Sequence, residues 1–326
     1  MDRPRIVCVV GPTASGKSAL GLLLAERSGG EVVSADSRQV YRGLDVGTAK
    51  PTAAERARVP HHGLDLVAPT EPFDAARFRA AATAAIDAIL ARGRVPIVVG
   101  GTGLWLRVLL RGLCPAPPRV PRLRAALERM VAAEGAPALH RWLAALDPAL
   151  AARVHPADAV RIVRGVEVAL ATGVPLSRTQ AAHGFDEAPY DALVVGLAWP
   201  TAALEARIAA RARAMVDAGF VEEVRALRAS GVPPDAPGFD AVGYREMLAA
   251  VEGRASVEEA LAATVGATRR FAKRQRTWFR REPGVHWRRA EDETPRIVAE
   301  VERFLARGTR PVACARAEIA NPGGPR

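Results

Sequence analysis

Short β-branched runs and helical apolar repeats alternate along the first hundred residues. The apolar run at 5–10 predicts a buried strand, and a glycine-containing loop separates it from a helical repeat at 19–27. Further strand-like runs stand at 31–34 and 95–99, with an alanine-rich helical stretch over 78–91 between them. Strands that alternate with helices predict an α/β fold, in which helices cover both faces of a parallel sheet. Ligands of such sheets bind beyond the carboxyl ends of the strands.

The middle of the chain follows a different pattern. From about residue 115 to residue 190 the strand-like runs disappear, and Leu, Ala and Val recur at helical spacing between Pro and Gly residues. This stretch predicts an all-helical insertion. A strand pattern returns at 193–197, and the apolar stripe after it predicts one long helix from Thr201 to about Ser230. The α/β core therefore resumes after the insertion.

The last third of the chain completes the core. Ser256-Val257-Glu258-Glu259 is a capping box, which predicts a helix that runs to about Arg281. A short edge strand at 285–287 and a last helix at 295–307 follow. The chain thus divides into a first core segment, a helical insertion, a second core segment and a flexible tail, at residues 1–114, 115–190, 191–307 and 308–326.

The composition excludes several classes of protein. The chain has 326 residues, of which 49% are hydrophobic and 25% charged, so it is globular rather than disordered and long enough for about two domains. Its three cysteines, Cys8, Cys114 and Cys314, show no C-x-x-C spacing, which argues against a disulfide framework and a cysteine metal site. No apolar run is long enough for a secretion signal or a membrane span, so we expect a soluble, cytoplasmic protein without a membrane partner.

The charge is strongly basic, with 46 Lys and Arg against 35 Asp and Glu, a net charge of +11. Most of the excess is arginine, whose planar donor fork suits phosphate, so nucleic acid is a plausible partner. A GC-rich gene would raise the arginine content without such a partner, and charge alone does not separate the two interpretations. In the arginine-rich helix before residue 281 we expect Phe271, Trp278 and Phe279 in the core, because they lie at core spacing.

A complete Walker A element stands between the first strand and the first helix. Its glycines allow backbone N–H groups to face phosphate oxygens, its lysine adds a positive charge, and its serine hydroxyl can ligate Mg²⁺. The candidate diphosphate-binding residues of this loop are Gly11, Pro12, Thr13, Ala14, Ser15, Gly16, Lys17 and Ser18. The loop predicts binding of a diphosphate or a triphosphate, of which ATP is the commonest case.

Two other strand ends and one helix face are directed at the same crevice. Asp36 follows the strand at 31–34, and it can be interpreted as a Mg²⁺-binding acid, a general base or a turn former. Thr102 follows the strand at 95–99, in a Gly-Thr-Gly turn. Arg207 and Arg211 are four residues apart and share a helix face, where two guanidinium groups suit a diphosphate clamp; a solvated arginine face is the commoner reason for this spacing.

Further motifs accompany the Walker A element in a fixed order. They are Asp36-Ser37-Arg38-Gln39-Val40-Tyr41, Asp45-Val46-Gly47-Thr48-Ala49-Lys50-Pro51, Pro60-His61-His62-Gly63-Leu64-Asp65, Gly100-Gly101-Thr102-Gly103-Leu104, His155-Pro156-x-Asp158, Arg161-x-x-Arg164-x-x-Glu167-Val168, Gly243-Tyr244-Arg245-Glu246 and Lys273-Arg274-Gln275-x-x-Trp278-Phe279. Together these motifs resemble the bacterial tRNA dimethylallyltransferase family, also called tRNA isopentenyltransferase. The resemblance covers about Arg5 to Trp287, and it implies a P-loop NTPase-like core with a tRNA-binding helical insertion.

The resemblance also implies a reaction. The family transfers a dimethylallyl group from dimethylallyl diphosphate to N6 of the adenosine at tRNA position 37, in tRNAs that read codons starting with U. Its P-loop grips the allylic diphosphate rather than ATP, and Mg²⁺ helps the leaving group. By the resemblance, Asp36 is the general base, Thr102 lies near the reacting diphosphate, and Lys17, Ser18 and Arg211 hold or neutralise the diphosphate with support from Arg207. An exocyclic amine is a poor nucleophile, so proton removal and a stabilised leaving group are the needs of this chemistry.

The basic excess gains a use if the substrate is tRNA, because the target base must be extruded while its phosphates are held. The anticodon stem-loop would be the partner, and by the family we expect a monomer. The tRNA contacts implied by the resemblance are Asp36, Ser37, Arg38, Gln39, Thr102, Arg124, Val160, Arg161, Ile162, Val163, Arg164, Asp240, Ala241, Val242, Gly243, Tyr244 and Arg245.

Three positions depart from the family pattern. Trp105 stands where the family usually has Tyr, which keeps an aromatic wall but loses a hydroxyl. Val160 stands where many members have Gln, and Asp240 where they have a basic residue, so tRNA contacts through these two positions are in doubt.

Three other functions share parts of this pattern. A small-molecule P-loop kinase would have the same phosphate loop but not the helical insertion. An adenylate isopentenyltransferase would keep the transfer chemistry with AMP or ADP as the acceptor, but such enzymes lack much of the insertion. A non-catalytic nucleic-acid binder would leave Lys17 and Asp36 without a role.

Overall fold

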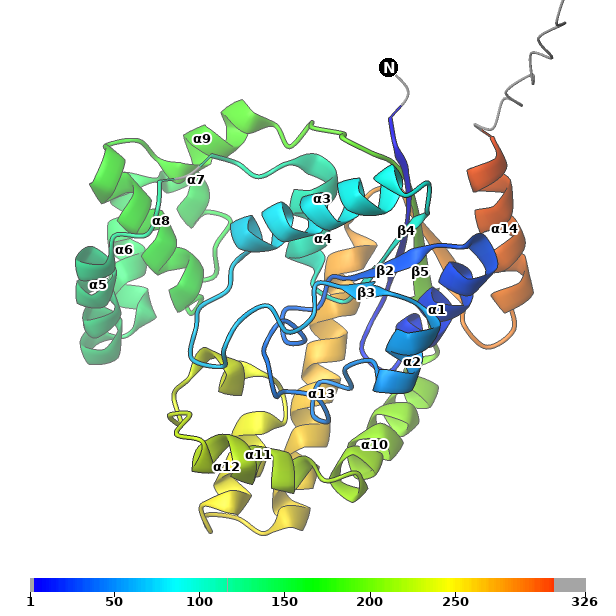
Figure 1. The fold of residues 1–326 in the computed structure, drawn as a ribbon. Helices are drawn as coiled ribbons and strands as arrows, with labels where there is room; N and C mark the ends of the chain where they lie inside the picture. Colours follow the sequence, from blue (N-terminus) through cyan, green and yellow to red (C-terminus); the bar gives the residue numbers. More distant parts are fainter. Residues whose placement is uncertain (1–2, 116, 308–326) are drawn as a thin grey trace, which may run out of the picture.

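The computed structural model describes residues 3–115 and 117–307, which form a parallel α/β core with a helical bundle at one side (Figure 1). The flexible tail predicted for 308–326 lies outside the described residues. Within them, no helix combines the length and the apolar character that crossing a membrane requires.

The core is a single sheet whose six described strands all run parallel. Its strand order is β3-β2-β4-β1-β5-β6. The strands are β1 (Arg5–Val10), β2 (Glu31–Ser34), β3 (His61–His62), β4 (Pro96–Gly100), β5 (Asp191–Ala198) and β6 (Val285–Arg289). The predicted α/β class is confirmed, and the phosphate loop after the central strand β1 lies between the ends of β4 and β5, where β1 pairs on both sides.

Both faces of the sheet are buried, because alternate residues of the central strands enter two separate hydrophobic cores. Val7 and Val9 pack with α1 (Lys17–Ser28) and α14 (Thr294–Ala306) on one face. Ile6 and Cys8 pack on the other face, against α3 (Ala75–Ala91), α4 (Gly103–Arg111) and helices of the second core segment. The carboxyl edge of the sheet is thereby left as the place for a site.

The insertion folds around a core of its own, built on residues such as Leu139, Leu143 and Ile162. Figure 1 shows it as a bundle beside the sheet. Its helices are α5 (Pro121–Glu134), α6 (Ala136–Leu146), α7 (Pro148–Ala151), α8 (Ala159–Thr172) and α9 (Leu176–His183).

The prediction of a single long helix from Thr201 to about Ser230 is wrong. The structure has α10 (Thr201–Asp217) and α11 (Phe220–Ala229), which are separated at Gly219. Gly219 has a φ of 95°, a left-handed conformation that ends a helix and that glycine adopts at little cost. Since α11 then turns away, its Phe220 and Val224 join the core.

The remaining helical elements lie outside the insertion. They are α2 (Ala53–Arg58), a 3₁₀ turn at Pro237–Asp240, α12 (Tyr244–Val251) and α13 (Val257–Arg280). The capping box at Ser256 is present, with the Ser256 hydroxyl accepting from the Glu259 amide at 3.2 Å. Of the aromatic residues expected in the core, Phe279 is fully buried, whereas Phe271 and Trp278 are only partly buried.

Candidate functional site

The phosphate loop has the backbone geometry that its glycines predict. Gly11 and Gly16 have φ values of 145° and 91°, and Ala14 between them has a φ of 62°. A Cβ on Gly11 would lie 2.9 Å from the Leu197 carbonyl oxygen of β5, so no larger residue fits there. The loop leads directly into α1, whose first residue is Lys17. A helix N-terminus is a ready site for an anion.

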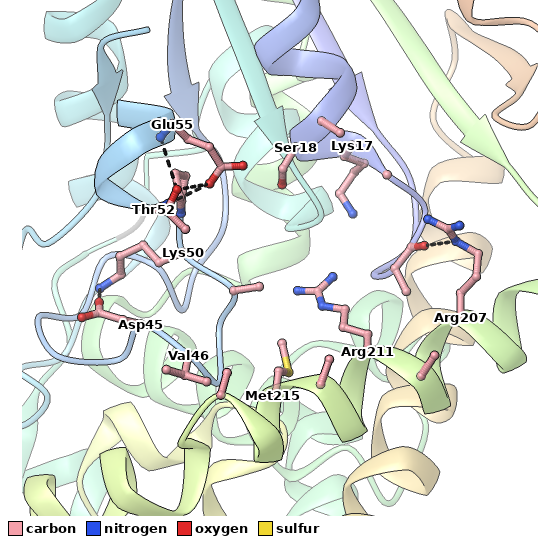
Figure 2. A pocket seen from close by; sticks show the side chains of 18 of the residues that line it. Lys17, Ser18, Asp45, Val46, Lys50, Thr52, Glu55, Arg207, Arg211 and Met215 are labelled. Atoms are coloured by element: carbon pink, nitrogen blue, oxygen red, sulfur yellow. Dashed lines mark hydrogen bonds and ion pairs between the residues drawn. The ribbon is translucent and has the colours of Figure 1, made fainter. Parts of the chain in front are cut away.

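Side chains from the second core segment hold this loop in place. The Trp199 indole donates to the Ser15 carbonyl at 2.9 Å, and Arg207 Nε donates to the Ala14 carbonyl at 2.8 Å. The Arg207 guanidinium also lies over the Trp199 ring, 4.2 Å from its centre. Arg207 therefore holds the phosphate loop in place, and Figure 2 shows it at the edge of the cavity.

Three cavities adjoin the loop, with volumes of about 1010, 190 and 70 Å³. Lys17 and Ser18 line the largest and the smallest, whereas Asp36 lines the two smaller ones. Arg211 lines all three, and in Figure 2 its guanidinium and the Lys17 amine both point into the largest cavity. The structure thus brings together the predicted general base, Asp36, and three of the predicted diphosphate ligands, Lys17, Ser18 and Arg211.

The electrostatics of Lys17 and Arg211 favour an anionic ligand. Burial and the nearby Arg211 lower the pKa of Lys17 to about 7, although Asp36 opposes this shift. Burial also lowers the pKa of Arg211, with a smaller contribution from Arg207. The amine donates to the Pro12 carbonyl at 2.7 Å, and Arg211 makes a long contact of 3.5 Å to the Thr13 hydroxyl. Neither Lys17 nor Arg211 forms an ion pair with a carboxylate within the described residues. A bound diphosphate would therefore stabilise the charged form of both side chains.

Asp36 and Thr102 lie at the ends of the neighbouring strands β2 and β4. One Asp36 oxygen accepts from the Arg38 amide at 2.9 Å. The Thr102 hydroxyl accepts from the Ser37 amide at 3.0 Å, and the Thr102 amide donates to the Ala35 carbonyl at 3.3 Å. The two strand ends are therefore tied together around the Asp36 carboxylate.

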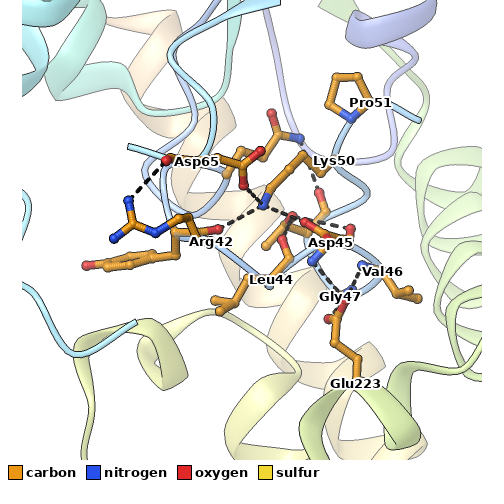
Figure 3. Close-up of polar contacts among 12 residues, drawn as sticks. Arg42, Leu44, Asp45, Val46, Gly47, Lys50, Pro51, Asp65 and Glu223 are labelled. Atoms are coloured by element: carbon orange, nitrogen blue, oxygen red, sulfur yellow. Dashed lines mark hydrogen bonds and ion pairs between the residues drawn. The ribbon is translucent and has the colours of Figure 1, made fainter. Parts of the chain in front are cut away.

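A loop at residues 45–50 forms the opposite wall of the cavities. The Glu223 carboxylate of α11 accepts from three successive amides of this loop, those of Asp45, Val46 and Gly47, at 2.8, 2.6 and 3.2 Å (Figure 3). Tyr244 donates to the same carboxylate at 2.6 Å. Burial and the charge of Glu223 raise the pKa of Tyr244, so its hydroxyl remains a donor.

The end of this loop is fixed by a buried lysine. The Lys50 amine bonds to the carboxylates of Asp45 and Asp65, each at 2.6 Å, and to the Tyr41 carbonyl at 2.8 Å (Figure 3). The side chain of Lys50 is 1% exposed, so these partners compensate its burial. The sequence predicts no function for the motif at residues 45–51. In the structure this motif forms a wall of the site that the contacts of Lys50 hold in place.

We expect Glu223→Ala to lower the free energy of unfolding by about 1–3 kcal/mol, because it leaves three amides and a buried hydroxyl without their acceptor. Tyr244→Phe removes one hydrogen bond only and should cost about 1 kcal/mol. Urea unfolding of both variants beside Glu222→Ala, a neighbour on the exposed face, would measure this. Equal stability of Glu223→Ala and Glu222→Ala would contradict the assignment.

A separate cleft of about 810 Å³ lies between the core and the insertion. Of the predicted tRNA contacts, Arg124, Val160 and Arg164 line it. Arg164 donates to Glu167 at 2.8 Å and to the Pro117 carbonyl at 2.6 Å, and Arg124 lies 3.5 Å from the same carboxylate. Because Glu167 is buried, these arginines also anchor the segment that enters the insertion.

Several predicted tRNA contacts have buried side chains. Ile162 and Val163 lie in the core of the insertion, and Ala241 and Tyr244 in the main core. Gln39 accepts from Ser34 at 2.9 Å and donates to the Thr48 and Ala49 carbonyls at 3.3 and 3.2 Å. Gly243 is buried where helix α12 begins. The side chains of Ile162, Val163 and Tyr244 are therefore enclosed by the protein, whereas Gln39 lines the 70 Å³ cavity and Ala241 lines the 190 Å³ cavity beside Asp36.

The other predicted contacts lie on two sides of the molecule. Ser37, Arg38, Asp240 and Val242 line the 190 Å³ cavity with Asp36, and Arg38 donates to the Pro237 carbonyl at 3.1 Å. Asp240 pairs with the exposed Arg245. Arg161 is exposed on α8, and Val160 beside it is 71% exposed.

The departure at Trp105 is explained by packing. Its ring is buried and stacks on Phe78 of α3, with 4.3 Å between the ring centres. The side chain thus belongs to the core under the cleft, where a tyrosine hydroxyl would have needed a hydrogen-bond partner.

Three residues of the site were not assigned from the sequence. Met215 of α10 lines the two larger cavities, while Phe271 lines the two smaller ones. Gln275 of α13 lines the smallest. Their signal in the sequence is helical spacing, since Met215 is four residues after Arg211 and Gln275 is four residues after Phe271.

The chain is similar to known proteins over most of its length. The profile of the IPP transferase family matches residues 39–282, and that of the Isopentenyl transferase family matches residues 4–60. The chain is 56% identical over 286 residues to a tRNA dimethylallyltransferase of Anaeromyxobacter dehalogenans (strain 2CP-C), covering 87% of this chain and 94% of the relative. It is 49% identical over 304 residues to tRNA dimethylallyltransferase 1 of Trichlorobacter lovleyi, covering 93% and 100%.

Solved structures of similar proteins carry related names. The full-length tRNA isopentenylpyrophosphate transferase from Bacillus halodurans is 37% identical, with a TM-score of 0.68 over 93% of this chain and 96% of that one. A eukaryotic dimethylallyltransferase described as acting on tRNA is 26% identical, with a TM-score of 0.80 over 93% of this chain and 80% of that one.

Proposed function

We infer the reaction of this chain from its family, since the chain belongs to the tRNA dimethylallyltransferases. We propose that it transfers the dimethylallyl group of dimethylallyl diphosphate to N6 of the adenosine at tRNA position 37, in tRNAs that read codons starting with U. The observation that carries the proposal is the position of Arg211, which lines all three cavities, beside Lys17 and Ser18 in the largest and beside Asp36 in the two smaller ones.

The diphosphate of the donor would bind at the N-terminus of α1. Lys17 and Arg211 supply the positive charge, and burial lowers the pKa of both groups. As the bond from the allylic carbon to the diphosphate oxygen breaks, negative charge grows on the diphosphate, and these two cations stabilise it. Arg207 supports this step indirectly, because it holds the loop rather than the ligand.

The acceptor amine would approach from the side of Asp36. A new bond forms between N6 and the allylic carbon, the diphosphate leaves with the electron pair of the broken bond, and the Asp36 carboxylate takes the proton that N6 loses. Thr102 holds the backbone of Ser37 next to this carboxylate, and so positions the base for proton transfer.

The residues present fit a magnesium ion that is held largely by the substrate. Mg²⁺ prefers oxygen ligands and commonly keeps waters and phosphate oxygens. The exposed Ser18 hydroxyl lines the same small cavity as Asp36, but no cluster of three metal-binding side chains occurs within 3–115 and 117–307. Ser18 would hold the ion, which when bound would neutralise charge on the leaving diphosphate.

The cleft between the core and the insertion is a suitable place for the anticodon stem-loop. Its arginines can neutralise phosphates, while the exposed Leu104 and Val160 offer apolar contacts to bases. Because the side chains of Ile162, Val163 and Tyr244 are enclosed in hydrophobic cores, we restrict the proposed tRNA-binding side chains to Asp36, Ser37, Arg38, Gln39, Thr102, Arg124, Val160, Arg161, Arg164, Asp240, Ala241, Val242 and Arg245. We propose a monomeric, cytoplasmic enzyme.

Label transfer tests this function. Radioactive dimethylallyl diphosphate with Mg²⁺ is offered to unmodified tRNA that carries adenosine after a U-reading anticodon, beside AMP as an alternative acceptor and ATP as an alternative donor. Label in the tRNA alone supports the proposal. Label in AMP would assign the adenylate acceptor, and ATP turnover without prenyl transfer would assign a kinase.

Diphosphate binding should weaken as the pH rises above about 7. In the free protein Lys17 loses its proton near that pH, whereas a bound anion favours the protonated amine, so binding takes up a proton above pH 7. Calorimetry with inorganic diphosphate should show up to tenfold weaker affinity per pH unit from this group. Lys17→Met removes the group, and comparison with it cancels the titration of the ligand itself. Parallel pH curves for the two proteins would refute this account.

A further inference from the structure

One side chain of α13 connects the two loops that would hold the two substrates. Gln275 is 6% exposed, and its carbonyl oxygen accepts from the Thr13 amide of the phosphate loop at 2.7 Å. Its amide nitrogen donates to the Gly101 carbonyl at 3.0 Å, one residue before Thr102. An amide side chain has one accepting and one donating end, so these two partners fix its orientation.

Thr13 and Thr102, which Gln275 connects through Gly101, each contact a further residue of the site. In the phosphate loop, which would bind the prenyl donor, the Thr13 hydroxyl contacts Arg211 at 3.5 Å. Near the proposed position of the tRNA adenosine, the Thr102 hydroxyl accepts a hydrogen bond from the amide of Ser37, the residue after Asp36. Gln275 thus connects the loop beside Arg211, which would neutralise the leaving diphosphate, with the strand ends beside Asp36, the proposed general base.

The surrounding residues are shaped for this approach. A Cβ on Gly101 would lie 2.2 Å from the Gln275 amide nitrogen, and a Cβ on Gly103 would lie 2.1 Å from the Trp278 ring. Phe271, Gln275 and Trp278 are four and three residues apart, so they share one face of α13. The two glycines that flank Thr102 therefore admit this face of the helix close to the loop after β4.

We propose that Gln275 is a positioning residue that sets the distance between the allylic diphosphate and the acceptor amine. This inference rests on the proposed function. Gln275 acts through Thr13 and Gly101 and need not touch either substrate. Because displacement of reacting groups by about 1 Å can cost 10²-fold in rate, losing the link should slow turnover more than it weakens binding.

The test uses two variants that break the link from opposite sides. Gln275→Met keeps the length of the side chain but removes both hydrogen bonds. Gly101→Ala keeps the Gln275 residue but displaces its side-chain amide, because the added Cβ would lie 2.2 Å from the amide nitrogen, the end of a flexible side chain. Thr277→Ala, at an exposed position on the same helix, is the matched control.

Each variant is measured for kcat of prenyl transfer, for affinity for inorganic diphosphate and tRNA separately, and for thermal stability. We expect kcat to fall about 10- to 100-fold in both variants, with either affinity changed less than about threefold and Thr277→Ala unchanged. If Gln275→Met folds and keeps kcat within about twofold, or if only diphosphate affinity falls, the positioning role is wrong. A rate loss that merely follows the unfolded fraction would overturn it as well. If the unmodified chain transfers no label to tRNA, the proposed function fails instead.

Discussion

Asp36→Ala is expected to lower turnover by about 10²-fold or more while tRNA still binds, because general-base assistance is worth about 10² to 10⁴ in rate. Asp36 lines the two smaller cavities, and one of its carboxylate oxygens accepts a hydrogen bond from the Arg38 amide in the same turn. Single-turnover transfer with saturating dimethylallyl diphosphate would measure the chemical step, and filter binding would measure tRNA affinity.

Asp36→Asn is the matched control, since an amide oxygen can still accept from the Arg38 amide but cannot take up the proton. If Asp36 is the general base, both Asp36→Ala and Asp36→Asn should turn over slowly, and Asp36→Asn should bind tRNA with normal affinity. If Asp36→Asn retained most of the activity of the unmodified chain, Asp36 would serve to shape its turn. Equal losses of rate and tRNA affinity would make it a substrate-positioning residue.

Arg211→Met should weaken binding of inorganic diphosphate by about 10- to 100-fold, since charge-assisted hydrogen bonds contribute about 1.5–3 kcal/mol each. Rate should fall further than affinity, because the guanidinium also faces the charge that develops as the diphosphate leaves. Calorimetry and transfer kinetics on the same preparation would separate the two effects.

Arg213→Met provides the comparison on the same helix. Arg213 is exposed and pairs with Glu258 at 2.7 Å, away from the cavities. Its loss should leave diphosphate affinity within about twofold, because exposed ion pairs contribute little. Similar affinities for the two variants would contradict a direct role of Arg211 at the diphosphate.

The parts of the site that depend on local chain geometry could be predicted from the sequence. The phosphate loop is defined by neighbours in the chain, since Gly11 and Gly16 supply the backbone conformations and Lys17 begins the helix. Asp36 and Thr102 could be placed beside it because parallel strands end at one edge. The helical insertion was predictable for the same reason, because its apolar period is written in consecutive residues.

What could not be predicted depends on partners far away in the chain. Glu223 lies in a stretch that resembles an ordinary amphipathic helix, and its acceptor role exists only because the turn at Gly219 directs α11 toward residues 45–47. Gln275 is 262 residues from Thr13, and nothing in its own segment indicates that partner. Tyr244 is predicted as a tRNA contact because its motif resembles the family, but a motif gives residue identity and not the burial of Tyr244 that the structure shows.

The arrangement of strands has a consequence for how the chain acquires its function during synthesis. The phosphate loop leaves the ribosome well before its supports, because the strand that flanks β1 on one side spans Asp191–Ala198 and the side chains that hold the loop are Trp199, Arg207 and Gln275. A nascent chain that stops before these residues would have the Walker A sequence without the supports of the loop. Contacts between such distant segments form slowly, so the loop should become competent for diphosphate only after nearly the whole core has emerged.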